Sequence, residues 1–157
     1  MVRNILVYPD PFLARKAAPV TKIDERMREL VRDLFDTMYA SEGIGLAATQ
    51  VGVDQRVIVV DVSPSDESGK PIALVNPEIL GQEGPIVVCM EGCLSVPGVR
   101  GEVARPEGVV VCGTNEQGEP VTIRAEGILA RALQHEIDHL DGVLFIDRIP
   151  SSPAPSK

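Results

Sequence analysis

The sequence is poor in several residue types and patterns, and each shortage narrows the classes of protein to which it can belong. Its 157 residues include three cysteines, two histidines and no tryptophan. An odd cysteine count without a secretion signal argues against a disulfide framework and for reduced thiols. No stretch approaches the roughly 18 apolar residues of a membrane span, and the start of the chain lacks the apolar core of a signal peptide. We therefore expect a cytoplasmic protein with no membrane-spanning segment.

Positive charge is also scarce. The chain has 15 lysines and arginines against 23 acidic residues, for a net charge of −8, and the basic residues form no cluster. Proteins that bind nucleic acid need basic surfaces for the phosphates, so we expect no direct nucleic-acid binding. The length fits one domain with a real core, which we expect over residues 1–150. Residues 151–157, Ser-Ser-Pro-Ala-Pro-Ser-Lys, have the composition of a flexible tail.

The histidines carry the clearest chemical signal. His135 and His139 lie four residues apart in the run Gln-His-Glu-Ile-Asp-His at 134–139. On a helix, this spacing places both rings on one face with Cβ atoms roughly 6 Å apart, so both can bind one divalent metal while Glu136 reaches a metal-bound water. The alternative is a pair of solvated histidines on an amphipathic helix. The apolar flanking residues favour the metal site.

A catalytic metal normally has three protein ligands, so a third residue is needed. No histidine follows His139, and the later carboxylates are poor candidates. Asp141 points away from the histidine face, while Asp147 precedes a proline-rich tail. Upstream, Cys93 stands between the structure-breaking residues Gly92 and Pro97, which could present a thiolate at a strand end. The other two cysteines, Cys89 and Cys112, lie in apolar runs typical of strands, and we interpret both as core residues.

Hydrophobic spacing predicts an α+β fold of mostly antiparallel sheets packed around a central metal-binding helix. Asp10 and Pro11 predict the start of a short helix, and a longer helix should run from Asp24 to Gly43. The metal-binding helix should begin near residue 126 and end at 141–142. The stretches with strand character are 56–62, 72–76, 86–90, 107–113 and 120–125.

Three stretches together resemble the signature motifs of bacterial peptide deformylases. They are Gly-Ile-Gly-Leu-Ala-Ala-Thr-Gln at 43–50, Glu-Gly-Cys-Leu-Ser at 91–95 and the histidine run at 134–139, in the family's order. The similarity extends over about residues 3–149. It implies the deformylase fold and a hydrolase that removes the formyl group from the N-terminal N-formylmethionine of newly made polypeptides, with release of formate.

The resemblance also implies a metal centre. Cys93, His135 and His139 would hold one divalent ion, and a thiolate with two imidazoles suits Zn²⁺ or Fe²⁺. The family favours Fe²⁺ in the cell, with Zn²⁺, Ni²⁺ or Co²⁺ as occupants of a purified sample. A metal-bound water would attack the formyl carbon, with Glu136 as general base and then general acid.

Further roles follow from the same motifs. Gln50 and the backbone N–H of Leu94 would stabilise the oxyanion. Arg105 and Asp138 would pair behind the metal ligands and brace their helix. Residues expected to contact the substrate, with Gly45 donating a backbone hydrogen bond and the others lining a slot for methionine, are Ile44, Gly45, Cys89, Ile128 and Ala132. Arg131 is expected at the rim of that slot.

Two other functions stay open. The histidine helix alone would permit a zinc endopeptidase, although the cysteine ligand and the lack of a third histidine argue against it. A non-catalytic metal-binding module is the other, in which Glu136 would be incidental. Many bacterial deformylases continue into a longer basic C-terminal helix that helps them dock on the ribosome. This sequence has a short proline-containing tail instead, so we expect any ribosome association to use other contacts.

Overall fold

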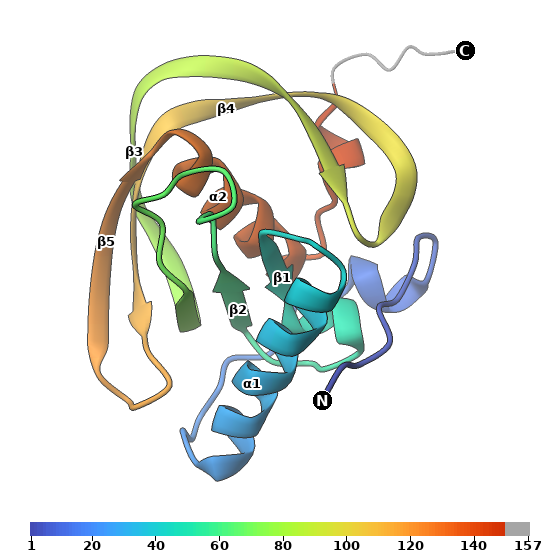
Figure 1. Cartoon of the computed structure of the whole chain (residues 1–157), viewed down its shortest axis with the longest axis vertical. Helices are drawn as coiled ribbons and strands as arrows, with labels where there is room; N and C mark the ends of the chain where they lie inside the picture. Colours follow the sequence, from blue (N-terminus) through green and yellow to red (C-terminus); the bar gives the residue numbers. More distant parts are fainter. Residues whose placement is uncertain (150–157) are drawn as a thin grey trace.

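The computed structural model describes residues 1–149. All five strands form one antiparallel sheet in the order β1-β2-β3-β4-β5. The strands are β1 (Gly45–Ala47), β2 (Val57–Val60), β3 (Ile72–Cys93), β4 (Val96–Thr114) and β5 (Pro120–Glu126). The helices are α1 (Glu25–Ala40), α2 (Gly127–Leu140) and the short 3₁₀ helices η1 (Pro11–Ala14), η2 (Ala48–Val51) and η3 (Phe145–Arg148). Figure 1 shows α2 inside the molecule, beneath a long arch made by β3 and β4.

The arch forms because two very long strands bend repeatedly while staying paired. The β3–β4 ladder has register shifts between Val75 and Glu78, between Ile79 and Gly81, and between Glu83 and Ile86. Extra residues at such bulges bend a strand and increase its twist. The two strands therefore curve over α2 as a pair, and the tight turn that joins them follows Cys93, the last residue of β3.

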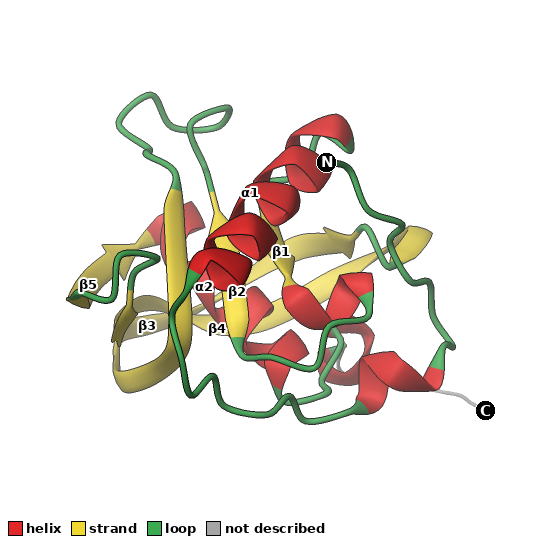
Figure 2. Cartoon of the chain, turned by 90° about the horizontal axis from the view of Figure 1, so that it is seen from below, coloured by secondary structure: helices red, strands yellow, loops and turns green. Residues whose placement is uncertain are grey.

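Helix α2 is buried because its apolar side chains face two parts of the sheet. Leu133, Ile137 and Leu140 pack with residues of β2, β4 and β5 in the largest hydrophobic cluster. The helix ends at Leu140 with Asp141 as its C-cap, and Gly142 follows with φ of +78°, a conformation that glycine adopts without strain. Helix α1 covers β1 and β2 with a second apolar cluster (Figure 2), and the Asp24 carboxylate accepts a hydrogen bond from Met27 N–H at its start.

The predicted fold class is confirmed, and so are the starts of all three predicted helices. The predicted strands are incomplete, because β1 and residues 96–106 of β4 were not predicted as strands, and their division is wrong in one respect. Segments 72–76 and 86–90 belong to the single strand β3, because the bulges bend this strand without ending it. Among residues 1–149, no helix is long and apolar enough to cross a membrane. The expected flexible tail at 151–157 lies outside the described residues.

Candidate metal centre

Three potential metal ligands converge from two elements that are far apart in sequence. Cys93 ends β3, whereas His135 and His139 lie one turn apart on α2. Their ligand atoms all lie within 4.8 Å of one another, and Cys93 Sγ is 3.3 Å from His139 Nε2. Tetrahedral zinc with ordinary Zn–S and Zn–N bond lengths separates sulfur from nitrogen by roughly 3.5 Å. The donor set therefore fits one divalent ion.

The two histidines differ in what holds their rings. His135 Nδ1 lies 3.0 Å from Glu91 Oε1, which leaves Nε2 to face the other ligands. Burial lowers the pKa of His135, but the neighbouring Cys93 and Glu91 outweigh this effect and raise the pKa to about 10. Burial and the nearby positive groups His135 and Arg105 hold the pKa of His139 well below its usual value. A metal ion binds neutral imidazole and thiolate, so metal affinity at this site depends on pH.

Glu136 is placed for proton transfer. Its carboxyl group is buried, and within residues 1–149 its Oε1 has no hydrogen-bond partner. Burial raises the pKa of Glu136 to about 7, which suits a group that must both take and give a proton near neutrality. The backbone of Gly45 approaches so closely that a Cβ at this position would lie 2.5 Å from Glu136 Oε2. A side chain at position 45 would therefore displace the carboxylate, which glycine leaves in place.

Gln50 lies beside the cysteine sulfur, and its orientation is fixed. Its Oε1 accepts a hydrogen bond from Ala47 N–H at 2.9 Å, while its Nε2 donates to Ser95 Oγ at 3.1 Å and approaches Cys93 Sγ at 3.6 Å. Ser95 N–H also points at the sulfur, at 3.4 Å. These donors orient the sulfur, and Ser95 was not among the predicted site residues. Leu94 lines the open cavity that lies over the ligands.

An open cavity of about 600 Å³ lies over these residues. This volume is typical of small-molecule and peptide-side-chain sites. Its lining includes most of the residues expected to contact substrate, namely Ile44, Gly45, Ile128 and Ala132, together with His135 and Glu136. Cys89 is not among its lining residues within the described chain, so its predicted contact with substrate stays a prediction.

The interpretation of Cys89 as a core residue is wrong, because its side chain is exposed. This part of β3 belongs to the arch, where the neighbouring apolar residues Val88 and Met90 are also more than half exposed. Helix α2 packs more extensively on β4 than on β3 and leaves this stretch uncovered. Cys112 is half-buried.

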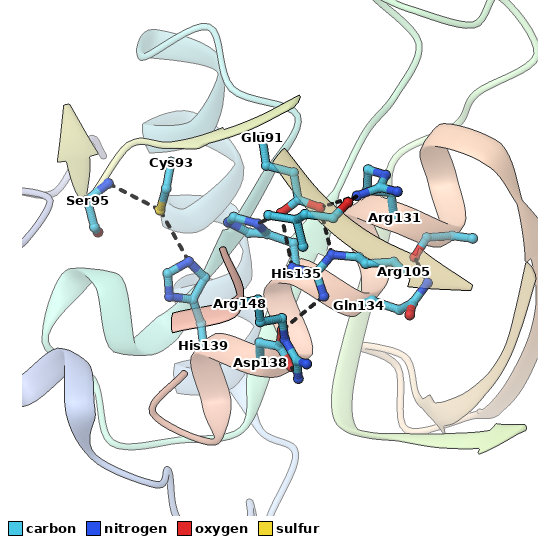
Figure 3. Close-up of polar contacts among 12 residues, drawn as sticks. Glu91, Cys93, Ser95, Arg105, Arg131, Gln134, His135, Asp138, His139 and Arg148 are labelled. Carbon is cyan, nitrogen blue, oxygen red and sulfur yellow. Dashed lines mark hydrogen bonds and ion pairs between the residues drawn. The ribbon is translucent and has the colours of Figure 1, made fainter. Parts of the chain in front are cut away.

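A buried ion network stands behind His135 (Figure 3). Glu91 accepts two hydrogen bonds from Arg105, at 2.6 and 3.0 Å, and one from Arg131, at 2.6 Å. Arg105 also pairs with Asp138 at 2.9 Å, the contact expected from the sequence. Hydrogen bonds to His135 and Arg105 outweigh the effect of burial and hold the pKa of Glu91 well below its usual value.

Sequence reasoning missed two members of this network. Glu91 lies within a recognised motif, but nothing in its spacing says that it would contact His135. Arg131 lines the cavity, as expected, but its guanidinium pairs with Glu91 and also donates to the backbone oxygens of Val87 and Val103. Its spacing of four residues from His135, on the same helix face, was the available signal.

The sequence and the fold are similar to those of known proteins. The family described as Polypeptide deformylase matches residues 2–154. The peptide deformylase of Natranaerobius thermophilus is 52% identical over 147 residues, which cover 94% of this chain and 92% of that protein. Among solved structures, the Thermotoga maritima peptide deformylase has a TM-score of 0.89 and 43% identity, covering 99% of both chains. A Synechococcus elongatus peptide deformylase in complex with actinonin has a TM-score of 0.89 and 44% identity, covering 94% of this chain and 78% of that one.

The family match spans nearly the whole chain, and the relatives are similar over most of their own lengths. These matches do not support the two alternative predictions, a zinc endopeptidase and a non-catalytic metal-binding module. The chain belongs to the polypeptide deformylase family, whose members are hydrolases that remove the N-terminal formyl group from newly made polypeptides.

Proposed function

We propose that Cys93, His135 and His139 hold the single metal ion of this deformylase and that Glu136 performs the proton transfers of the reaction. The observation that carries this proposal is the convergence of the three ligand atoms, within 4.8 Å of one another, beside a buried carboxylate whose Oε1 has no partner in residues 1–149. Residues 1–150 form the catalytic domain in this proposal.

A divalent ion bound by these ligands supplies Lewis-acid chemistry, polarising the formyl carbonyl and lowering the pKa of water toward ~7. Glu136 takes the proton of the attacking water and delivers it to the amine that leaves from the formyl carbon. A positioned general acid and base of this kind contributes typically ~10²–10⁴-fold in rate.

The oxyanion that develops on the formyl group needs hydrogen-bond donors at fixed positions. We assign this role to Gln50 Nε2 and to the backbone N–H of Leu94. The hydrogen bond between Gln50 Oε1 and Ala47 N–H supports the assignment, because it directs the amide nitrogen toward Cys93. One donor of this kind is worth about 10²–10³ in turnover.

The methionine side chain occupies the apolar part of the cavity, which is lined by Ile44, Ile128 and Ala132. Gly45 donates its backbone N–H to the substrate chain. The aliphatic stem of Arg131 contributes to the inner wall, because its guanidinium is held by Glu91 and two backbone oxygens.

The decisive experiment compares a formylated peptide with the same peptide lacking the formyl group. We expect formate and a free amino terminus from N-formyl-Met-Ala-Ser and no cleavage of Met-Ala-Ser. Internal cleavage of a longer unformylated peptide would identify an endopeptidase instead. Absence of turnover by metal-loaded protein would leave only a metal-binding module.

We propose Fe²⁺ as the ion in the cell, with Zn²⁺, Ni²⁺ or Co²⁺ replacing it during purification. The family resemblance supports this choice, since a thiolate with two imidazoles suits Fe²⁺ and Zn²⁺ alike, and the cysteine ligand exposes the site to oxidation. Protein prepared without oxygen should therefore turn over faster than protein prepared in air. Equal turnover and equal metal content in the two preparations would contradict iron.

We place the protein in the cytoplasm, where nascent N-formylmethionyl polypeptides emerge. Its net charge of −8 gives no support to direct binding of ribosomal RNA. We therefore expect any ribosome association to depend on the nascent chain. Cosedimentation with ribosomes that requires a formylated nascent chain would support this, and equal cosedimentation without one would contradict it.

A further inference from the structure

The segment that follows α2 turns back and lies against the metal centre, although it supplies no ligand. A Cβ at Gly142 would collide with the carbonyl oxygen of Ala14, so only glycine allows the chain to pass at this point. The Asp147 carboxylate then accepts a hydrogen bond from Leu144 N–H at 2.9 Å and closes the turn of η3. Figure 1 shows η3 beside the far end of the β3–β4 arch.

Phe145, the first residue of η3, packs on a metal ligand. Its ring lies 6.2 Å from the His135 ring with an angle of 25° between the planes, and its side chain is 1% exposed. It belongs to the hydrophobic cluster against which Cys93 also packs. The turn therefore packs on one ligand, His135, and shares a hydrophobic cluster with another, Cys93.

Arg148, the last residue of η3, binds a residue of the metal-binding helix. Its Nε and Nη2 donate to the two oxygens of Asp138, at 2.6 and 2.8 Å. Asp138 lies on α2 between the two histidine ligands. A two-point contact with a planar guanidinium fixes the orientation of this carboxylate, which a single contact would not do.

From Asp138 the contacts continue without a gap to the first ligand, as Figure 3 shows. Asp138 Oδ2 accepts from Arg105 Nη1 at 2.9 Å. Arg105 holds both oxygens of Glu91, and Glu91 Oε1 lies 3.0 Å from His135 Nδ1. If Asp138 lost Arg148, only the single contact with Arg105 would set its orientation, and Arg105 would be shared differently between the two carboxylates.

Building on the proposed function, we propose that Arg148 is a positioning residue for the deformylation reaction. It acts on His135 through Asp138, Arg105 and Glu91, and its role is to keep that imidazole aimed at the ion. The Arg148 side chain is 45% exposed. A half-exposed ion pair adds little to overall stability, so its principal effect is on the geometry of the site.

The test compares the wild type with Arg148→Met, Arg148→Lys and the control Arg124→Met. Arg124 also pairs with a carboxylate, that of Glu83, but its side chain is 73% exposed and the pair lies away from the metal centre. Each protein is loaded with Zn²⁺ and diluted into a coloured chelator, and the release of Zn²⁺ is timed. Then kcat and KM are measured with N-formyl-Met-Ala-Ser, and Tm is measured for each protein.

Loss of a ligand-orienting partner costs typically 10–100-fold in affinity or activity, and Arg148 acts through three intermediates. We therefore expect Arg148→Met to release Zn²⁺ roughly 3- to 10-fold faster and to lose kcat by a similar factor, with KM changed by less than about twofold. Arg148→Lys keeps the charge without the two-point contact, so it should fall between Arg148→Met and the wild type. Arg124→Met should match the wild type.

Zn²⁺ release and kcat at the wild-type rates in Arg148→Met would overturn the positioning role, whether or not Tm falls. The proposed function fails separately, if the loaded wild type produces no formate from the peptide. In that case the release rates still decide whether Arg148 stabilises the metal centre.

Discussion

Glu91 connects the metal centre to the ion network, and replacing it with glutamine is the most informative single change. Its carboxylate is 5% exposed and receives three contacts from Arg105 and Arg131 and one from His135. A glutamine has one acceptor oxygen, and its amide nitrogen must face one pair of these donors. Glu91→Gln therefore removes the charge that balances the arginines and breaks about half of the contacts.

The size of the effect follows from burial. Removing one partner of a buried ion pair costs about 3–5 kcal/mol, because the other charges stay buried without compensation. In a domain of this length each kcal/mol lowers Tm by about 2–4 °C, so the expected decrease is roughly 6–20 °C. Metal binding should also weaken by ~10–100-fold. A glutamine N–H facing His135 Nδ1 favours the tautomer that protonates Nε2, which then cannot bind the ion.

Thermal unfolding followed by circular dichroism should be measured in excess chelator, so that lost metal does not add to the change in Tm. Glu102→Gln is the matched control, since Glu102 is exposed on the same pair of strands. The control should change Tm by less than about 2 °C, because surface substitutions are usually within ±0.5 kcal/mol. A Tm of Glu91→Gln equal to that of the control would refute the claim that this network stabilises the fold.

Three further predictions concern the active site and its surroundings. Glu136→Gln should keep its metal content in elemental analysis and lose about 10²–10⁴-fold in kcat, and an active variant with full metal would mean that another group transfers the proton. Gly45→Ala should reduce kcat/KM with little change in Tm, because its Cβ would press on the Glu136 carboxylate; unchanged kinetics would show that the strand moves away freely. Tyr39 donates to Asp61 at 2.6 Å, and this hydrogen bond lowers the pKa of Asp61. Its stabilisation is complete above the unfolded pKa of about 4 and is lost as the pH falls through the lower folded pKa. The free energy of unfolding of Tyr39→Phe, measured with urea, should therefore be about 1.5 kcal/mol lower than that of the wild type at pH 7. The difference should shrink below pH 4. A constant difference would exclude the carboxylate as the acceptor.

Local signals in the sequence predicted the helices well. Helix α1 starts next to Asp24, where the apolar spacing predicted its start, and the same kind of spacing places α2 within a residue of its observed bounds. Both depend on interactions within a few residues of the chain. The histidine spacing likewise predicts a shared helix face, and the structure brings the two rings to 5.0 Å.

What the sequence did not predict depends on contacts between distant segments. The single arched strand β3 exists because bulges keep it paired with β4 through bends, whereas proline and glycine in this stretch indicate breaks when taken alone. The contacts of Glu91 with His135 and of Arg148 with Asp138 join residues brought together by the turn after α2 and by the arch. The periodicity of apolar residues along the chain does not predict contacts of this kind. Cys89 shows the same limit, because an apolar run does not reveal whether another element covers it.

X-ray absorption at the metal edge of the loaded protein tests the central claim most directly. The account predicts one sulfur at ~2.3 Å and two imidazole nitrogens at ~2.0–2.1 Å from a Zn²⁺ ion. The sulfur signal should disappear in Cys93→Asp. A wild-type spectrum with only nitrogen and oxygen neighbours would contradict the claim that Cys93, His135 and His139 bind the same ion.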